Sequence, residues 1–164
     1  MKKNNPLFDK IKSDLTKKGF KIAGENLDKP WGAYFLINEK QTEKFIKEFF
    51  SHIELPPFDQ SLKLSPKILV VAPDKRLSWQ YHHRRREIWT VLEGPVEIVT
   101  NKIDKLIPGK QYEKNDFIDI GLGERHRLVG LNNWGVVAEI WVHTNPDNPS
   151  NEDDIVRVQD DFNR

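Results

Sequence analysis

Apolar and polar positions follow two different periods along the chain, and the change falls just after residue 52. Before it, apolar residues recur every three or four positions, as they do on one face of an α-helix. After it, they form short runs rich in β-branched and aromatic residues, separated by glycine, proline and asparagine. The pattern therefore predicts a mainly-β structure with helical additions at its N-terminal side.

Residues 1–52 predict a helix, a strand and a second helix. Asn5 is a suitable N-cap, and Pro6 suits the first turn of the helix that follows it. The run "KPWGAYFLI", residues 29–37, has proline and glycine ahead of β-prone residues, which indicates a turn leading into a strand. A second helix is expected over residues 41–52, because the paired prolines of "ELPPFDQ" prevent its continuation.

Seven β-prone runs are predicted between Leu64 and His143. They are "KILVVAP", "RLSWQYHH", "EIWTVLEG", "VEIVTN", "KQYEKNDFIDI", "HRLVGLN" and "GVVAEIWVH". No helix-length insert separates them, so an antiparallel sandwich or barrel is favoured over a parallel sheet. We expect residues 53–164 to form this barrel and an acidic tail with a short final element, and the whole chain to be one structural domain.

The composition of the chain argues against several classes of function. The 164 residues have a net charge of +1, which disfavours a general nucleic-acid binder. The chain has no cysteine, which excludes disulfides, thiolate catalysis and Cys-ligated zinc. We find no apolar run long enough to cross a membrane and no apolar signal segment, so we expect a cytoplasmic protein.

The segment "SWQYHHRRREIWTVLEG", residues 78–94, carries the most informative polar side chains. If it forms a hairpin that turns at residues 84–85, His82 and Glu87 fall opposite each other. Gln80 then shares their face, because strand side chains alternate with a period of two. Three potential metal ligands therefore converge.

The arginines at this turn have two interpretations. The first is that they are simply exposed to solvent, and the second is that they attract an anionic substrate.

His126 is a fourth candidate ligand, because "GLGERHRL" reads as a turn that delivers its imidazole into the barrel. One amide oxygen, two imidazoles and one carboxylate suit a borderline divalent metal with an open coordination position. Each of these residues alone has an ordinary explanation, as part of a solvated turn or as a hydrogen-bonded surface histidine. Trp89 and Val91 continue the inward face of Glu87 and favour the shared site.

These residues resemble the cupin superfamily. "LSWQYHHRRREIWTVLEG" is similar to the first cupin motif and "GLGERHRLVGLN" to the second. More narrowly, "KPWGAY", "LSWQYHHRRREIW" and "EDDIVRVQDDFNR", in this order between Lys29 and Arg164, resemble the cupin domain of type II mannose-6-phosphate isomerases. The resemblance implies a cupin double-stranded β-helix, or jelly-roll barrel. That domain also occurs behind a mannose-1-phosphate guanylyltransferase domain, which this sequence does not resemble, so nucleotidyl transfer is not implied.

The resemblance also implies a ligand set and a substrate site. It assigns one divalent metal to Gln80, His82, Glu87 and His126, with zinc as the first choice and manganese, iron, cobalt or nickel as alternatives. It places Arg157 and Arg164 in the sugar-phosphate site. Lys29 of "KPWG" is a further substrate-binding candidate.

An arginine fork matches phosphate oxygens and stays charged, which supports this role. Two alternatives stay open. The arginines could instead neutralise nearby carboxylates, and "KPWG" could shape a turn with Trp31 covering the barrel end. The carboxylates in question are Asp153, Asp154, Asp160 and Asp161.

The sequence departs from the family pattern at three places. Ile88 stands where the family has a histidine after the metal-binding glutamate, and that histidine is linked with isomerase activity. The turn before His126 reads "GLGERH" without the usual proline, and the last motif ends "DDFNR" where an aromatic residue, glycine and arginine are usual. We therefore expect metal binding to be better preserved than catalysis.

The leading hypothesis is a metal-dependent sugar-phosphate isomerase in carbohydrate metabolism, which interconverts mannose 6-phosphate and fructose 6-phosphate through an enediolate. Arg157, Glu124 and His143 are the candidate catalytic residues, and a metal-bound hydroxide is an alternative base. A non-catalytic cupin that binds a sugar or sugar phosphate is the second hypothesis, and a metal-dependent epimerase or dioxygenase the third. A homodimer formed through an edge strand or the N-terminal segment stays open.

Overall fold

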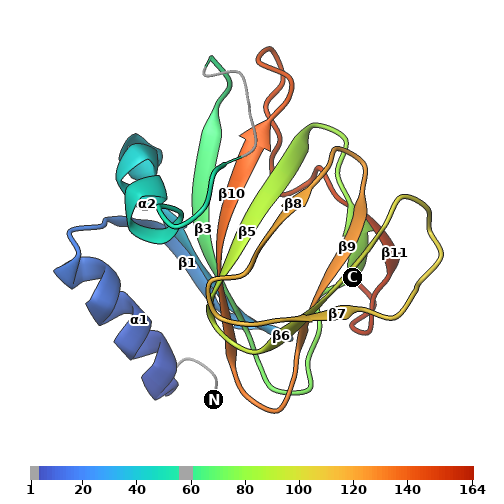
Figure 1. The fold of residues 1–164 in the computed structure, drawn as a ribbon, viewed down its shortest axis with the longest axis horizontal. Helices are drawn as coiled ribbons and strands as arrows, with labels where there is room; N and C mark the ends of the chain where they lie inside the picture. Colours follow the sequence, from blue (N-terminus) through green and yellow to red (C-terminus); the bar gives the residue numbers. More distant parts are fainter. Residues whose placement is uncertain (1–3, 56–60) are drawn as a thin grey trace.

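The computed structural model describes residues 4–55 and 61–164, and within them two antiparallel sheets face each other to form a barrel (Figure 1). Sheet A has the strand order β1-β2-β3-β10-β5-β8 and sheet B the order β11-β4-β9-β6-β7. The elements are α1 (Pro6–Lys17), β1 (Ile22–Lys29), β2 (Gly32–Ile37), the 3₁₀ turn η2 (Glu39–Gln41), α2 (Thr42–Phe49), β3 (Leu64–Val71), β4 (Trp79–Tyr81), β5 (Arg85–Glu93), β6 (Val96–Asn101), β7 (Lys110–Tyr112), β8 (Phe117–Ile120), β9 (Arg125–Gly130), β10 (Gly135–His143) and β11 (Val156–Gln159). The predicted mainly-β barrel with N-terminal helices is confirmed.

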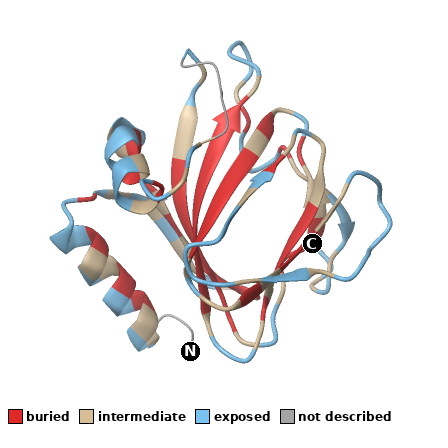
Figure 2. Cartoon of the chain, viewed as in Figure 1, coloured by how far each residue is buried: buried red, intermediate tan, exposed pale blue. Residues whose placement is uncertain are grey.

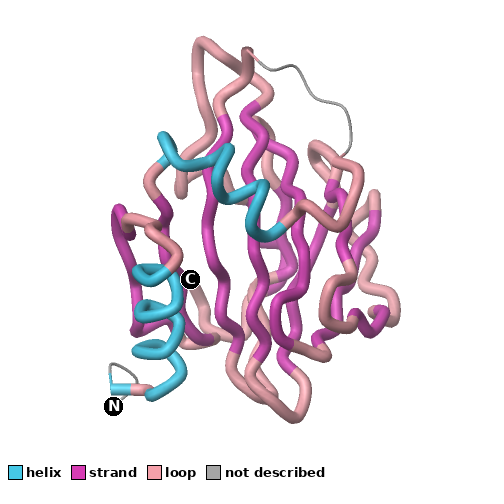
Figure 3. The backbone as a smooth tube through the Cα atoms, turned by 60° about the vertical axis from the view of Figure 1, so that its left-hand side comes forward, coloured by secondary structure: helices cyan, strands magenta, loops and turns pink. Residues whose placement is uncertain are grey.

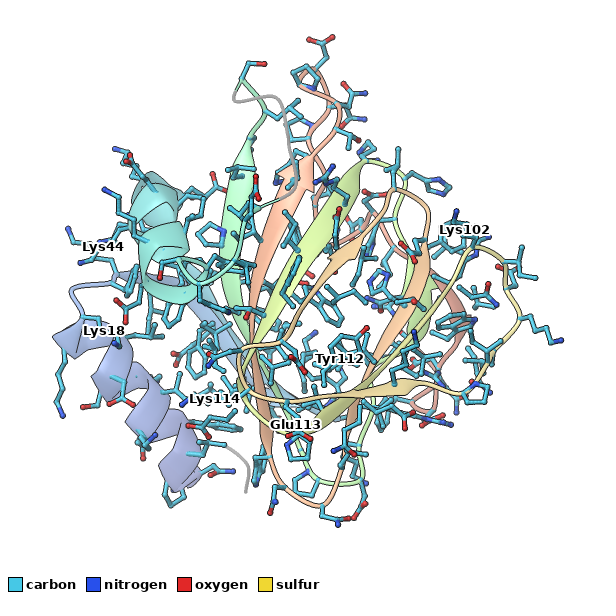
Figure 4. All side chains as sticks on the ribbon, in the orientation of Figure 1. Lys18, Lys44, Lys102, Tyr112, Glu113 and Lys114 are labelled. Atoms are coloured by element: carbon cyan, nitrogen blue, oxygen red, sulfur yellow. The ribbon has the colours of Figure 1, made fainter. Side chains whose placement is uncertain are left out.

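Both helices lie against the outer face of sheet A (Figures 1 and 3). Helix α1 begins as predicted, with Oδ1 of Asn5 accepting a hydrogen bond from the Leu7 amide at 2.9 Å. Lys18, just after α1, pairs with Glu48 of α2, and the ammonium of Lys44 lies 5.0 Å from the centre of the Phe20 ring (Figure 4). These charges join the two helices to each other, and their apolar residues pack on the sheet.

Helix α2 ends at Phe49, three residues before the predicted end at His52. The last residues of the predicted helix form a turn, in which the Ile53 amide donates to the Phe50 carbonyl at 3.2 Å. The two prolines expected to stop the helix lie outside the described residues.

Two strand predictions were incomplete. Strand β1 was not predicted, because "IAGENLDK" forms an edge strand that is only partly buried and is rich in polar residues. The run "KQYEKNDFIDI" was read as one strand, yet it contains β7 of sheet B and β8 of sheet A. The predicted short final element is present as β11, which pairs with β4.

Strand β10 is buried along its whole length because it separates two apolar cores (Figure 2). Its outward-facing residues contact the core beneath the helices, together with Ile88 of β5 and Phe8 of α1. Its inward-facing Val137 contacts the core between the sheets, together with Trp89 and Val91. The inward face predicted for Trp89 and Val91 is confirmed.

The "KPWG" turn connects β1 to β2 at the edge of sheet A. Gly32 has φ +150°, and a Cβ atom there would lie 1.9 Å from the carbonyl oxygen of Val70, so only glycine fits. Trp31 is 5% exposed and belongs to the core between the sheets. The predicted turn is confirmed, and a substrate-binding role for Lys29 stays a prediction. Neither described helix combines the length and apolar character needed to cross a membrane.

Candidate metal centre

His82 and Glu87 meet because the chain crosses between the two sheets, and not because it forms a hairpin. Strand β4 belongs to sheet B and β5 to sheet A, and residues 82–84 connect them. The predicted hairpin at residues 84–85 is therefore wrong. Nε2 of His82 nevertheless lies 3.1 Å from Oε1 of Glu87, and both side chains are 2% exposed. The crossover produces the convergence that the hairpin was expected to produce.

His126 approaches the same carboxylate from β9. Its Nε2 lies 3.3 Å from Oε2 of Glu87, and ligand atoms of His82, Glu87 and His126 all lie within 4.8 Å of one another. Gln80 is the register partner of His126, so their side chains share one face of sheet B. Gln80 lines the same cavity as Glu87, and its Oε1 accepts a hydrogen bond from the Ser78 hydroxyl.

Both imidazoles are held in the tautomer that a metal requires. Nδ1 of His82 donates to the Asp154 carbonyl at 2.6 Å, and Nδ1 of His126 donates to the Glu124 carbonyl at 2.9 Å. Because a carbonyl can only accept, each Nδ1 carries the proton, which in the neutral imidazole leaves the Nε2 lone pair facing Glu87. Nε2 of His126 is buried and has no hydrogen-bond partner in the described structure. The donor set therefore fits a divalent cation.

The charge states of the cluster agree with this fit. Burial lowers the pKa of His82, which favours the neutral imidazole, although the neighbouring charge of Glu87 opposes this shift. Burial alone would raise the pKa of Glu87, but His82, His126 and Arg85 outweigh it and hold that pKa well below its ordinary value. A neutral imidazole and an ionised carboxylate are the forms in which His82 and Glu87 bind a metal.

Arg85 is a buried member of the site and not part of a solvated turn. Its side chain is 5% exposed, and its Nε donates to Oε1 of Glu87 at 2.8 Å. Its Nη2 donates to Nε2 of His82 at 3.2 Å, and its guanidinium stacks 3.5 Å from the centre of the Trp141 ring. The solvated-turn interpretation is therefore wrong for Arg85. Its position two residues before Glu87 on the same strand face was the signal that could have revealed it.

The tail holds the crossover in place through Asp154. Its carboxylate accepts from the backbone amides of His83 at 2.9 Å and Arg84 at 3.0 Å, and from the Ser150 hydroxyl at 2.6 Å. Burial would raise the pKa of Asp154, but these hydrogen bonds lower it. Because the Asp154 carbonyl also accepts from His82, one residue fixes both the loop and the imidazole.

The cavity beside the cluster is rich in cations. It is lined by Gln80, Glu87 and Trp89, by Trp141, and by basic side chains that come from four separate segments: Lys29, Lys67, Arg85, Arg157 and Arg164. Burial lowers the pKa of Lys29, and the neighbouring charges of Arg164, Lys67 and Arg157 lower it further, while Glu152 opposes them. The near-neutral net charge of the chain thus conceals a locally cationic cavity.

The two tail arginines differ in their partners. The guanidinium of Arg164 makes two hydrogen bonds to Asp160, at 2.9 Å each from Nε and Nη2, which is the neutralising interaction considered as the alternative. Arg157 is exposed, is the register partner of Gln80, and has no ion pair among the described residues. Both line the cavity, so Arg157 is the more available to a ligand.

Glu139 of β10 is a residue of the cavity that the sequence interpretation missed. It is 3% exposed, and the indole Nε1 of Trp89 donates both to it, at 3.0 Å, and to Glu87, at 3.1 Å. Burial raises the pKa of Glu139 well above its ordinary value, and the charge of Glu87 raises it further. The signal was a lone carboxylate at an inward position of the apolar run "GVVAEIWVH".

Two candidate catalytic residues lie outside this cavity. Oε2 of Glu124 accepts from the Gly121 amide at 2.7 Å and so holds the turn before His126. Nε2 of His143 lies 2.8 Å from Oγ of Ser65, in a neighbouring cavity. Burial lowers the pKa of His143 to about 4. The structure brings neither side chain to the cluster.

The chain is similar in sequence to several known proteins. Residues 48–160 match the family described as mannose-6-phosphate isomerase C-terminal. The chain is 28% identical over 122 residues to mannose-1-phosphate guanylyltransferase 2 of Escherichia coli O157:H7, covering 70% of this chain and 24% of that protein. It is 29% identical over 136 residues to the xanthan biosynthesis protein XanB of Xanthomonas campestris pv. campestris, covering 83% and 23%. The chain thus spans less than a quarter of these curated relatives.

A solved structure shares the fold. The capsular polysaccharide assembling protein CapF from Staphylococcus aureus superposes with a TM-score of 0.53 at 18% sequence identity, covering 82% of this chain and 33% of that one. The barrel, with its buried His–Glu–His cluster, defines a cupin. Within that class, the chain belongs to the family described as mannose-6-phosphate isomerase C-terminal.

Ile88, where the resemblance implied a histidine, faces away from the cluster. It is 0% exposed and packs in the core beneath the helices, on the opposite face of β5 from Glu87. The Ile88 side chain therefore takes no part in the cluster.

Proposed function

We propose that the protein is a metal-dependent sugar-phosphate isomerase that interconverts an aldose phosphate and a ketose phosphate, with mannose 6-phosphate and fructose 6-phosphate as the first pair to test. The observation that carries the proposal is the buried His82–Glu87–His126 cluster beside a cation-lined cavity. Membership of the mannose-6-phosphate isomerase C-terminal family supports the substrate class.

Gln80, His82, Glu87 and His126 would hold the metal, and zinc is the first ion to test because imidazole and carboxylate ligands suit it. A bound divalent ion would supply Lewis acidity toward the oxygens of the sugar. Arg85 keeps Glu87 ionised and oriented through the 2.8 Å hydrogen bond. The hydrogen bonds to Nδ1 of both histidines keep their Nε2 atoms aimed at the cluster.

The cationic side chains of the cavity would bind the phosphate. Arg157 is the best placed, because its guanidinium is exposed at the cavity and always charged. Lys29 lines the same cavity and would add a second positive charge, and Arg164 would add a third if it exchanged Asp160 for the ligand. These residues would fix the phosphate end of the substrate relative to the cluster.

Aldose–ketose isomerisation needs a group that moves a proton between two adjacent carbons. Glu139 is our candidate, since Glu124 and His143 face elsewhere. It lines the cavity, and its Oε2 is buried with no hydrogen-bond partner in the described structure. A carboxyl group with a raised pKa exchanges its proton closer to neutral pH, as a general acid–base group must.

The test is turnover by purified protein reconstituted with zinc or, in parallel, with manganese, iron, cobalt or nickel. We expect conversion of mannose 6-phosphate to fructose 6-phosphate, and its loss in Glu139→Gln with the metal retained. Absence of turnover on mannose 6-phosphate and on related aldose phosphates, with stoichiometric metal, would overturn the proposal. Saturable binding of the phosphorylated sugar without turnover would instead identify a sugar-phosphate-binding cupin.

A further inference from the structure

Two neighbouring cavities share three of their lining residues. The cavity beside the metal cluster measures about 60 Å³, and its neighbour, which contains Ser65 and His143, about 550 Å³. Pockets that hold small organic ligands commonly measure roughly 300–1,000 Å³. A hexose phosphate therefore needs more room than the metal cavity offers. Lys67, Trp141 and Glu152 line both cavities and form the wall between them.

The wall contains an ion pair between Lys67 and Glu152, whose side chains differ in solvent exposure. Nζ of Lys67 lies 3.1 Å from Oε1 of Glu152; the lysine side chain is 8% exposed, but the glutamate is 59% exposed. The same ammonium lies 4.3 Å from the centre of the Tyr34 ring and 4.8 Å from that of Trp141. The lysine is therefore fixed by its surroundings, whereas the glutamate is held mainly by the lysine.

An anionic ligand can replace this carboxylate with a gain in charge pairing. A buried ammonium requires a counterion, and a phosphate group carries more negative charge than the single carboxylate it would displace. Lys29, Arg157 and Arg164 line the metal cavity with Lys67, so the incoming phosphate meets four cations. Displacement of Glu152 from Lys67 also removes the contact that separates the two cavities.

We infer that Lys67 binds the ligand phosphate together with the exposed cations of the cavity, and that the Glu152 carboxylate occupies the phosphate position beside Lys67 in the free protein. This inference rests on the proposed function, because it takes the ligand to be a sugar phosphate bound beside the metal cluster. It adds a specificity-determining residue and an autoinhibitory contact to that site. A phosphorylated sugar can then displace Glu152 from Lys67, whereas a neutral sugar cannot.

The test compares three variants by calorimetric titration with inorganic phosphate, mannose 6-phosphate and mannose. Glu152→Gln removes the competitor with little change in shape. Asp153→Asn is its matched control, because the neighbouring Asp153 is exposed and its side chain has no ion pair among the described residues. Lys67→Met keeps the apolar stem between the two rings and removes the charge.

We expect Glu152→Gln to bind both phosphorylated ligands about threefold to fivefold more tightly, as loss of one partly exposed ion pair implies, and Asp153→Asn to match the parent protein. Lys67→Met should bind them at least about tenfold more weakly, the effect of a lost charge-assisted hydrogen bond. Mannose binding should be equal in all of them. Equal affinities in Glu152→Gln and Asp153→Asn would overturn the inference, even if Lys67→Met does not fold.

The two proposals can fail separately. Tighter phosphate binding by Glu152→Gln without isomerase turnover would support the wall and reject the enzyme. Turnover of mannose 6-phosphate with the same KM in the parent protein and in Glu152→Gln would support the enzyme and reject the role of the wall.

Discussion

The two faces of β10 are equally buried but differ in chemistry. Its outer face is uniformly apolar and contacts the helices through Val136, Ala138, Ile140 and Val142. Its inner face begins with apolar Val137 and then carries Glu139, Trp141 and His143. Polar groups are costly to bury unless they are hydrogen-bonded or paired. The comparison therefore separates a face that stabilises the fold from one that holds groups for chemistry.

The largest effect is expected from removing a ligand on the inner side of the barrel. His126→Ala should reduce metal affinity by at least about 100-fold, since loss of a group that merely orients a ligand costs about 10–100-fold. Bound metal, measured by elemental analysis after reconstitution, should then fall well below one equivalent. Ile88→Val is the control, because Ile88 lies on the outer face. Full retention of metal by both His82→Ala and His126→Ala would show that the cluster is not the metal site.

The next effect concerns the outer face alone. Ile140→Ala should lower the free energy of unfolding by about 2–5 kcal/mol, because it leaves a cavity in the core beneath the helices, where Ile140 is 1% exposed. Urea denaturation measures this loss. The folded variant should still bind one equivalent of metal. A variant that loses metal but not stability would contradict the separation of the two faces.

A pH effect of intermediate size is expected from His143. Its pKa is lowered to about 4 in the folded protein, against about 6.5 in an unfolded chain. Between these values the unfolded chain binds more protons, so the free energy of unfolding falls as pH decreases, by up to about 1.4 kcal/mol per pH unit. Urea denaturation at pH 7 and pH 4.5 should show a smaller fall for His143→Gln. Equal falls would show that His143 is not buried in its neutral form.

The smallest effect is expected at the cavity mouth. Arg157→Ala should raise the KM for a phosphorylated sugar by about tenfold, the effect of one charge-assisted hydrogen bond, with little change in thermal midpoint because Arg157 is exposed. Lys102→Ala removes the same charge from an exposed loop on the sheet B side (Figure 4) and should leave KM unchanged. A KM that Arg157→Ala does not alter would leave Arg157 with a structural role.

Much of the fold follows from local patterns in the sequence. The alternation in "EIWTVLEG" and "GVVAEIWVH" predicts strands, and the stripe after Asn5 predicts α1, because neighbouring residues decide these elements. Strand β1 was not predicted, because an edge strand pairs with only one neighbour, β2, and tolerates polar residues. Turn signals mark where a strand ends, but they do not say which sheet the next strand joins, so the crossover at residues 82–84 was read as a hairpin.

The site was predictable where one strand face carries it. Glu87, Trp89 and Val91 were found by their period of two, and the same rule extended backwards includes Arg85. Glu139 required knowledge that β10 pairs with β5, which places Glu139 beside Trp89. The Lys67–Glu152 pair joins residues 85 positions apart in the sequence, and no local pattern predicts it.

The hydrogen bond between His82 and the Asp154 carbonyl affects the order in which parts of the protein form during synthesis. Domains fold as their residues emerge from the ribosome. A nascent chain that has emerged as far as His143 already includes every strand of sheet A, together with His126 and Glu87. It lacks the carbonyl that orients His82 and the carboxylate that holds the crossover. We therefore expect most of the barrel to form before Asp154 is in place to orient His82, so that the metal site is completed last.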